Sequence, residues 1–182
     1  MELDLSKVNE LDLSKFGNNI NEYQYRQYFL GNAGQEHYKL LAYFSTLFNE
    51  QTLLDIGTYK GCSALALAFN EKNNVKSFDL GNYRRINNEP NNIEFILDDF
   101  TNKKYKKLVL DSPFIMLDTD HDGTFEHIAY KYLKDINWTG YLLLDDIHLN
   151  DPMKEFWNSI DNEKHDVTVV GHWSGTGLVI FE

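Results

Sequence analysis

The sequence contains a single cysteine, Cys62, so no disulfide can form within the chain and a reducing compartment is expected. It has no run of 18 apolar residues and no basic-then-apolar leader, so it predicts no membrane-spanning helix. Basic residues are scarce, with 17 Lys and Arg against 28 Asp and Glu and a net charge of −11. We therefore expect a cytoplasmic protein that binds neither nucleic acid nor a membrane surface.

The composition predicts one globular core, because 42% of the 182 residues are hydrophobic and 14% are aromatic. We divide the chain into an N-terminal arm, residues 1–33, and a main domain, residues 34–182. The arm repeats Glu2–Lys7 identically as Glu10–Lys15, which is too few copies for a solenoid. An aromatic cluster at 23–29 follows, and it either caps a substrate site or only covers the domain surface.

The stretch from Thr52 to Asn70 is the centre of the predicted fold. Leu53, Leu54 and Ile56 form a short apolar run of strand length, and Gly57 and Gly61 bracket a tight turn. Ser63–Phe69 predicts a buried helix. The spacing is Gly-x-x-x-Gly, so the stretch has neither the Gly-x-Gly-x-x-Gly of dinucleotide sites nor the Gly-Lys-Ser/Thr ending of a P-loop. An ordinary strand-to-helix turn without a ligand is the alternative interpretation.

Asp55 and the glycine turn that follows it resemble motif I of class I S-adenosylmethionine-dependent methyltransferases, and more narrowly the metal-dependent O-methyltransferases. The resemblance implies that S-adenosylmethionine is the cofactor. The residues that it places in contact with this cofactor are Asp55, Gly57, Thr58, Tyr59, Gly61 and Ser63.

Two further aspartates follow the next predicted strands. Val75–Leu80 contains Asp79 about twenty positions after the glycine turn, where a carboxylate can accept hydrogen bonds from both ribose hydroxyls. Asp98 follows the strand Ile93–Leu97, and the resemblance implies that it accepts a hydrogen bond from the adenine amino group. Either aspartate could instead face water or cap the next turn.

The rest of the chain alternates strands and helices. The predicted strands are Phe114–Leu117, Gly140–Leu144, Val167–Val170 and Leu178–Phe181; the predicted helices are Gln35–Phe48, Gly123–Asp135, one that begins at Asp151 and a short one within Asn82–Asn92. Ser174–Gly177 is predicted to connect the last two strands as a hairpin. This order predicts an α/β fold with a Rossmann-like, doubly wound, seven-stranded, mostly parallel sheet and a C-terminal antiparallel hairpin.

Three carboxylates are expected to converge beside the cofactor crevice. Asp118 ends one strand, and Asp145 and Asp146 end a neighbouring one. Carboxylates that lie so close repel one another unless a cation neutralises them, and all-oxygen ligation points to Mg²⁺, with Mn²⁺ or Ca²⁺ as alternatives. No Cys/His cluster indicates zinc. The alternative is that one or more of these aspartates caps a helix or faces solvent.

His121 stands three positions after Asp118, and the resemblance implies that it is the general base, with Asp118 beside it. Asp118-x-x-His121 followed by Asp145-Asp146 is similar to the members that methylate sugar hydroxyls of natural products and glycans. His148 is the rival base. His172 and Trp173 would wall the acceptor pocket, unless the tryptophan belongs to the core.

The resulting hypothesis is transfer of a methyl group from S-adenosylmethionine to a hydroxyl of a sugar or another small molecule, with a divalent metal and a histidine base. Dimers are common in the family that the chain resembles, so a homodimer is one option. The alternatives are a metal-independent methyltransferase, a dinucleotide-dependent oxidoreductase and a non-catalytic binding module.

Overall fold

The computed structural model describes residues 3–182. Glu2, the first residue of the repeat, and the first two residues of the predicted arm lie outside this range. The strands are β1 (Thr52–Ile56), β2 (Asn74–Asp79), β3 (Ile93–Leu97), β4 (Phe114–Leu117), β5 (Gly140–Asp145), β6 (Lys164–Asp166) and β7 (Thr176–Phe181). In the described part of the chain they form a seven-stranded sheet in the order β3-β2-β1-β4-β5-β7-β6. Only β7 runs against β5 and β6, which confirms the predicted fold class.

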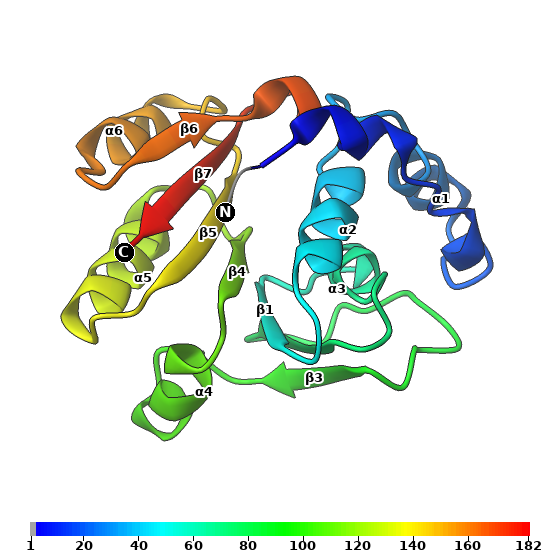
Figure 1. The fold of residues 1–182 in the computed structure, drawn as a ribbon, viewed down its shortest axis with the longest axis horizontal. Helices are drawn as coiled ribbons and strands as arrows, with labels where there is room; N and C mark the ends of the chain where they lie inside the picture. The colour runs from blue at the N-terminus through cyan, green and yellow to red at the C-terminus, as the bar shows by residue number, and fades with distance from the viewer. Residues whose placement is uncertain (1–2) are drawn as a thin grey trace.

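Helices cover both faces of this sheet (Figure 1). They are α1 (Tyr23–Phe29), α2 (Tyr38–Leu47), α3 (Cys62–Leu67), α4 (Lys106–Leu110), α5 (Thr124–Asp135) and α6 (Asp151–Ser159), with short 3-10 helices at Leu5–Glu10, Ser14–Phe16, Lys103–Tyr105 and Thr168–Val170. Among residues 3–182 no helix combines the length and the apolarity needed to cross a bilayer.

Strand β4 shows how one sheet supplies two cores. Side chains alternate between the faces of a strand, so Phe114 and Met116 join the core under α2 and α3, while Ile115 and Leu117 join the core under α5 and α6. All four are buried, as expected for a parallel strand that is covered on both sides. This double cover fixes β4 in the middle of the sheet, and its carboxyl end carries Asp118.

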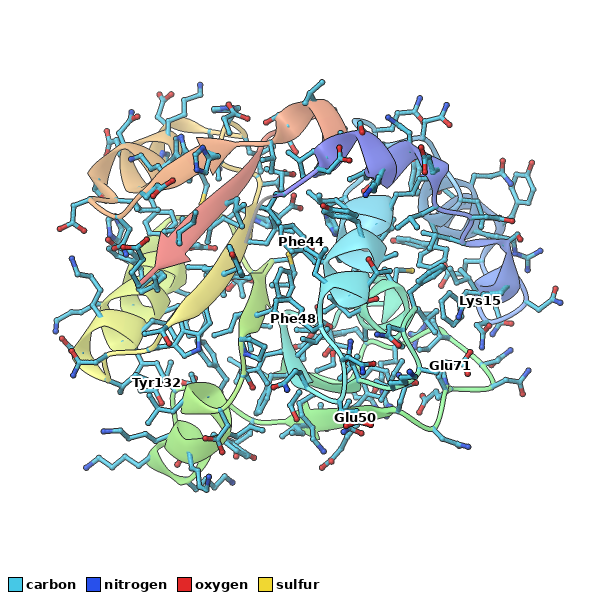
Figure 2. All side chains as sticks on the ribbon, viewed as in Figure 1. Lys15, Phe44, Phe48, Glu50, Glu71 and Tyr132 are labelled. Carbon is cyan, nitrogen blue, oxygen red and sulfur yellow. The ribbon has the colours of Figure 1, made fainter. Side chains whose placement is uncertain are left out.

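Helix α2 packs on the sheet through aromatic rings (Figure 2). Phe44 lies on the helix and Phe48 directly follows it, and their ring centroids are 4.8 and 6.2 Å from that of Phe114 on β4. Burying rings of this size stabilises the fold by about 1.5–3 kcal/mol each. The helix is therefore held firmly against β4, which positions the residue just before it, His37.

The repeated segment folds into the same turn twice. Asp4 accepts hydrogen bonds from the backbone N–H and hydroxyl of Ser6, and Asp12 does the same for Ser14. The residue after each repeat, Val8 or Phe16, is buried in the core shared with α2 and α3. The 3–33 segment is thus packed into the main core.

An ion pair fastens this segment to the turn after α3. The ammonium of Lys15 lies 3.3 Å from the Glu71 carboxylate, and both residues are labelled in Figure 2.

Two local predictions were wrong. Val167–Val170 is no strand: Asp166 accepts hydrogen bonds from the backbone and hydroxyl of Thr168, which turns the chain into a 3-10 helix. The edge strand is the preceding Lys164–Asp166, whose polar sequence gave no apolar signal. Asn82–Asn92 holds no helix either; it is an irregular loop tied to the N-terminal segment by the Ile20–Ile86 bridge.

Candidate functional site

A cleft of about 610 Å³ opens at the carboxyl ends of β1, β2 and β4, a volume typical of small-molecule sites. In an open α/β sheet this is the edge where ligands bind. Four predicted cofactor residues line it, namely Gly57, Tyr59, Asp79 and Asp98, together with Asp118 and His121. Its walls also carry the apolar side chains of Phe78, Leu80, Phe100 and Phe125.

The glycine turn brings β1 close to the backbone of β4. Gly57 has φ +99°, and a Cβ added there would lie 1.6 Å from the carbonyl oxygen of Asp118. The turn is also tied to β2, because Asp79 accepts hydrogen bonds from the backbone N–H groups of Tyr59 and Gly81, both at 2.9 Å. Asp79 is therefore held at the cleft edge with further lone pairs free to accept from a ligand.

Asp98 also lines this cleft and directly follows β3. Its carboxylate accepts hydrogen bonds from the Asp99 N–H and the Tyr105 hydroxyl and lies 2.5 Å from the Lys104 ammonium. The hydrogen bond from Lys104 holds the pKa of Asp98 below its usual value. The residue is thus an ionised acceptor, as the adenine interpretation requires.

A second, smaller pocket adjoins the turn. Thr58 and Ser63 line it with Gly57, Tyr59 and Asp118, and the N-terminal segment contributes Tyr25. The Tyr25 hydroxyl lies 3.4 Å from that of Tyr59. Gly61, at φ +93°, lines neither pocket.

Asp55 is fully buried beneath the turn and lines neither pocket. It accepts a 2.6 Å hydrogen bond from the Ser77 hydroxyl, which lies 2.6 Å from that of Thr58. Burial raises the pKa of Asp55 to about 7, against hydrogen bonds from Ser77 and Ser63 that lower it. In this structure Asp55 supports the glycine turn through the hydrogen bonds that link it to Ser77 and Thr58.

Replacing Asp55 with asparagine is expected to flatten the pH dependence of stability. The folded pKa of about 7 exceeds the unfolded value of 3.8, so the folded state holds the proton longer. Stability from this group therefore falls as the pH rises from about 4 to 7, by about 1.4 kcal/mol per unit and about 4 kcal/mol in all. Urea unfolding of wild type and Asp55→Asn across that range measures the difference.

The exposed Asp135, paired with Lys131 at the end of α5, supplies the matched control. Asp135→Asn should leave the wild-type pH slope unchanged. If Asp55→Asn showed the wild-type slope as well, the buried neutral carboxyl would be ruled out.

Beside the large cleft, Asp118, Asp145 and Asp146 converge as predicted, and His121 lies among them. The His121 Nε2 atom is 3.1 Å from Asp118 Oδ1 and 3.3 Å from Asp146 Oδ2. Asp145 and Asp146 are nearly buried, at 4% and 6% exposure. The His121 ring therefore bridges two of the three aspartates, Asp118 and Asp146.

The sequence interpretation did not include two further ring contacts to this triad. His37, just before α2, places Nδ1 at 3.2 Å from Asp145 Oδ1 and Nε2 at 4.0 Å from Asp118 Oδ2. His172, in the β6–β7 connection, places Nδ1 at 3.3 Å from Asp145 and 3.1 Å from Asp146. His37 follows no strand, so the strand-end rule could not find it. His172 was expected only to wall an acceptor pocket.

Strained backbone and buried hydrogen bonds fix the His121 loop. His121 and Asp146 adopt φ of +56° and +59°, a region that non-glycine residues seldom occupy outside constrained sites. The buried Glu126 accepts hydrogen bonds from Thr119 and from the His121 N–H, and Asn150 donates to the His121 carbonyl. Glu126 on α5 and Asn150, the residue before α6, therefore fix the backbone of His121.

The cluster raises the pKa of each histidine. Burial alone would lower these values, but the neighbouring carboxylates outweigh it and raise the pKa of His37 and His121 to about 9 and that of His172 to about 10. When protonated, the three rings carry positive charge that balances the negative charge of the aspartates.

A divalent cation fits the same position. The side-chain oxygens and ring nitrogens converge, and Asp145 Oδ1 and both His37 nitrogens are buried without hydrogen bonds among the described residues.

The rival base His148 and the exposed Trp173 make no ion pair or hydrogen bond through their side chains to the triad among the described residues. The His148 ring pairs with Asp166 at 2.7 Å. Trp173 is 69% exposed and contacts the His172 ring edge-on, so it does not belong to the core.

No protein-family model and no sequence among curated proteins matches this chain. Solved structures do match. A methyltransferase from Podospora anserina with bound S-adenosylhomocysteine superposes with a TM-score of 0.58 at 16% identity, over 80% of this chain and 77% of that one. A putative caffeoyl-CoA O-methyltransferase from Staphylococcus aureus gives 0.57 at 12% identity, over 100% and 93%.

An O-methyltransferase from Bacillus cereus in complex with S-adenosylhomocysteine gives a TM-score of 0.54 at 12% identity, over 100% of this chain and 93% of that one. At these identities the likeness concerns the fold. The chain therefore has the Rossmann-like fold found in S-adenosylmethionine-dependent methyltransferases.

Proposed function

We propose that this protein transfers a methyl group from S-adenosylmethionine to a hydroxyl oxygen of a small molecule. The observation that carries the proposal is the continuity of two sites: a nucleoside-sized cleft with Asp79 and Asp98 in its wall opens directly onto Asp118 and His121. A ligand held at one end can thus present a reactive group at the other.

The charge of the cleft favours this cofactor over a dinucleotide. Five aspartates line it, Asp79, Asp98, Asp99, Asp118 and Asp120, and among residues 3–182 the only basic side chain in that lining is His121. Such a wall attracts a sulfonium or ammonium cation and repels a pyrophosphate. Together with the absent dinucleotide motif, it disfavours the oxidoreductase alternative.

In the proposed reaction Asp79 holds the ribose, Asp98 holds the adenine, and the apolar walls keep water from the methyl group. His121 accepts the proton of the acceptor hydroxyl, once its ring is neutral, as the oxygen attacks the methyl carbon and the thioether leaves. A divalent ion bound at Asp118, Asp145 and Asp146 would supply positive charge that lowers the pKa of the hydroxyl. The Asp118-x-x-His121 and Asp145-Asp146 pattern supports a sugar hydroxyl as the acceptor.

Calorimetric titration with S-adenosylhomocysteine tests the cofactor. We expect wild type to bind it and Asp79→Asn to bind about 10-fold to 100-fold more weakly, because a hydrogen bond to a charged group contributes about 1.5–3 kcal/mol. Asp111→Asn is the matched control, since Asp111 pairs with Lys107 on the surface. Equal affinity in wild type and Asp79→Asn would remove the ribose assignment, and no binding by wild type would remove the proposal.

Two further experiments distinguish the metal-dependent methyltransferase from the metal-independent one and from the binding module. Methyl transfer to a panel of sugars, with chelator and after addition of divalent metal, distinguishes the metal-dependent reaction from a metal-independent one. Cofactor binding without turnover on any acceptor would favour the binding module.

A further inference from the structure

His37 is a buried imidazole that faces carboxylates. The residue is 2% exposed, and neither ring nitrogen has a hydrogen-bond partner among the described residues. Its nearest polar neighbours are Asp145 and Asp118, and Asp145 Oδ1, 3.2 Å from the ring, also lacks a hydrogen bond. Buried polar atoms are costly when left unmatched, and a ring nitrogen and a carboxylate oxygen that face each other in this way can hold either a proton or a cation between them.

The surrounding atoms have the arrangement of a metal-binding donor set. Potential ligand atoms lie within 4.8 Å of one another in three overlapping groups: His37–Asp118–Asp145, Asp145–Asp146–His172 and Glu36–His37–His172. Adjacent ligands of a six-coordinate ion with bonds of about 2.1 Å are about 3.0 Å apart. The 3.2 Å separation of His37 Nδ1 from Asp145 Oδ1 is close to that spacing.

The position of His37 makes it a fixed donor. It immediately precedes α2, and α2 is anchored on β4 by Phe44. The His37 ring also packs against that of Tyr38, with centroids 4.8 Å apart. An imidazole that is held so firmly loses little conformational entropy when it binds an ion.

We propose that His37 binds the catalytic cation directly through a ring nitrogen, and that this nitrogen makes the site prefer a first-row transition ion such as Fe²⁺, Co²⁺ or Zn²⁺ over Mg²⁺. This inference rests on the proposed metal-dependent function and replaces its all-oxygen ligand set with a mixed one. Mg²⁺ is bound mainly through oxygen, whereas imidazole nitrogen favours the later divalent ions of the first row.

Co²⁺ is a suitable probe because its binding can be followed without turnover. Metal-free protein is titrated with CoCl₂ and, separately, with MgCl₂ in a calorimeter. We expect tighter binding of Co²⁺, and a loss of at least about 10-fold to 100-fold in Co²⁺ affinity in His37→Gln, the range known for removing even an indirect partner of a metal ligand. Mg²⁺ affinity should change much less.

Proton NMR of the Co²⁺-loaded protein gives an independent readout. Each coordinated imidazole shows one strongly shifted, exchangeable N–H signal. His37→Gln should remove one such signal, and His165→Gln should remove none, because His165 is exposed and pairs with Glu163. If His37→Gln does not fold, cross-relaxation from a shifted N–H signal to the nearby Tyr38 ring identifies His37 in the wild-type protein.

Mg²⁺ binding as tight as Co²⁺ binding, retention of every shifted signal in His37→Gln, or no cross-relaxation to Tyr38 in the wild type would overturn the inference. Titration of the same samples with S-adenosylhomocysteine keeps the two proposals apart. Cofactor binding with no nitrogen ligand from His37 rejects only the inference, and Co²⁺ binding through His37 with no cofactor binding rejects the methyl-transfer proposal instead.

Discussion

Gly57→Ala is expected to destabilise the protein severely and to abolish cofactor binding. The backbone at Gly57 has φ +99°, and the new Cβ would lie 1.6 Å from the Asp118 carbonyl oxygen, which belongs to the backbone and cannot rotate away. To remove this clash, β1 and β4 would have to separate at the point where the Asp118 N–H donates a hydrogen bond to the Ile56 carbonyl. Such a clash in a packed core costs more than about 3 kcal/mol.

Thermal and urea unfolding measure this effect against two graded controls. Gly61→Ala also has a positive φ, but its Cβ would meet the flexible tip of Ile86 at 2.9 Å, so we expect a smaller loss of about 1–3 kcal/mol. Gly17→Ala should cost least of the three, because Gly17 has a helical φ of −57° and its Cβ would lie 3.3 Å from the Ser14 carbonyl oxygen. A Gly57→Ala protein as stable as the Gly17→Ala variant would contradict the close approach of β1 and β4.

The fold was predictable because its local signals agree with its global arrangement. Leu53–Ile56 and Phe114–Leu117 are short apolar runs at the length of buried strands, and each is a central parallel strand here. The same reasoning failed at Val167–Val170, where an apolar run is bent into a 3-10 helix by hydrogen bonds from Thr168 to Asp166. Side-chain hydrogen bonds of this kind do not alter hydrophobic periodicity.

The site was predictable only where a residue follows a strand. Asp79, Asp118 and Asp145 could be placed from the rule that carboxyl ends of parallel strands share an edge, and the structure brings Asp118 and Asp145 to one cluster. His37 reaches that cluster from the start of a helix, and the contact depends on how α2 packs across the sheet. The sequence could not reveal this, because tertiary packing sets the distance between His37 and Asp145.

Replacing His121 with glutamine is expected to lower the methyl-transfer rate by about 10²-fold to 10⁴-fold, the usual contribution of a general base. Glutamine keeps a polar group of similar reach between Asp118 and Asp146 but cannot accept a proton near neutral pH. The cofactor should bind with wild-type affinity, because the proposed ribose and adenine contacts are made by Asp79 and Asp98 and not by His121. The part of the pH dependence of the rate that arises from protonation of His121 should also disappear.

Steady-state kinetics across pH, with cofactor affinity measured on the same samples, separate this role from a structural one. His148→Gln is the matched control: its ring pairs with Asp166 and makes no ion pair with the three aspartates among the described residues, so we expect a near wild-type rate. The opposite pattern, a slow His148→Gln and an active His121→Gln, would transfer the base to His148. The geometry argues for His121, because among the described histidines its ring alone both lines the large cleft and lies within 3.3 Å of Asp118 and Asp146.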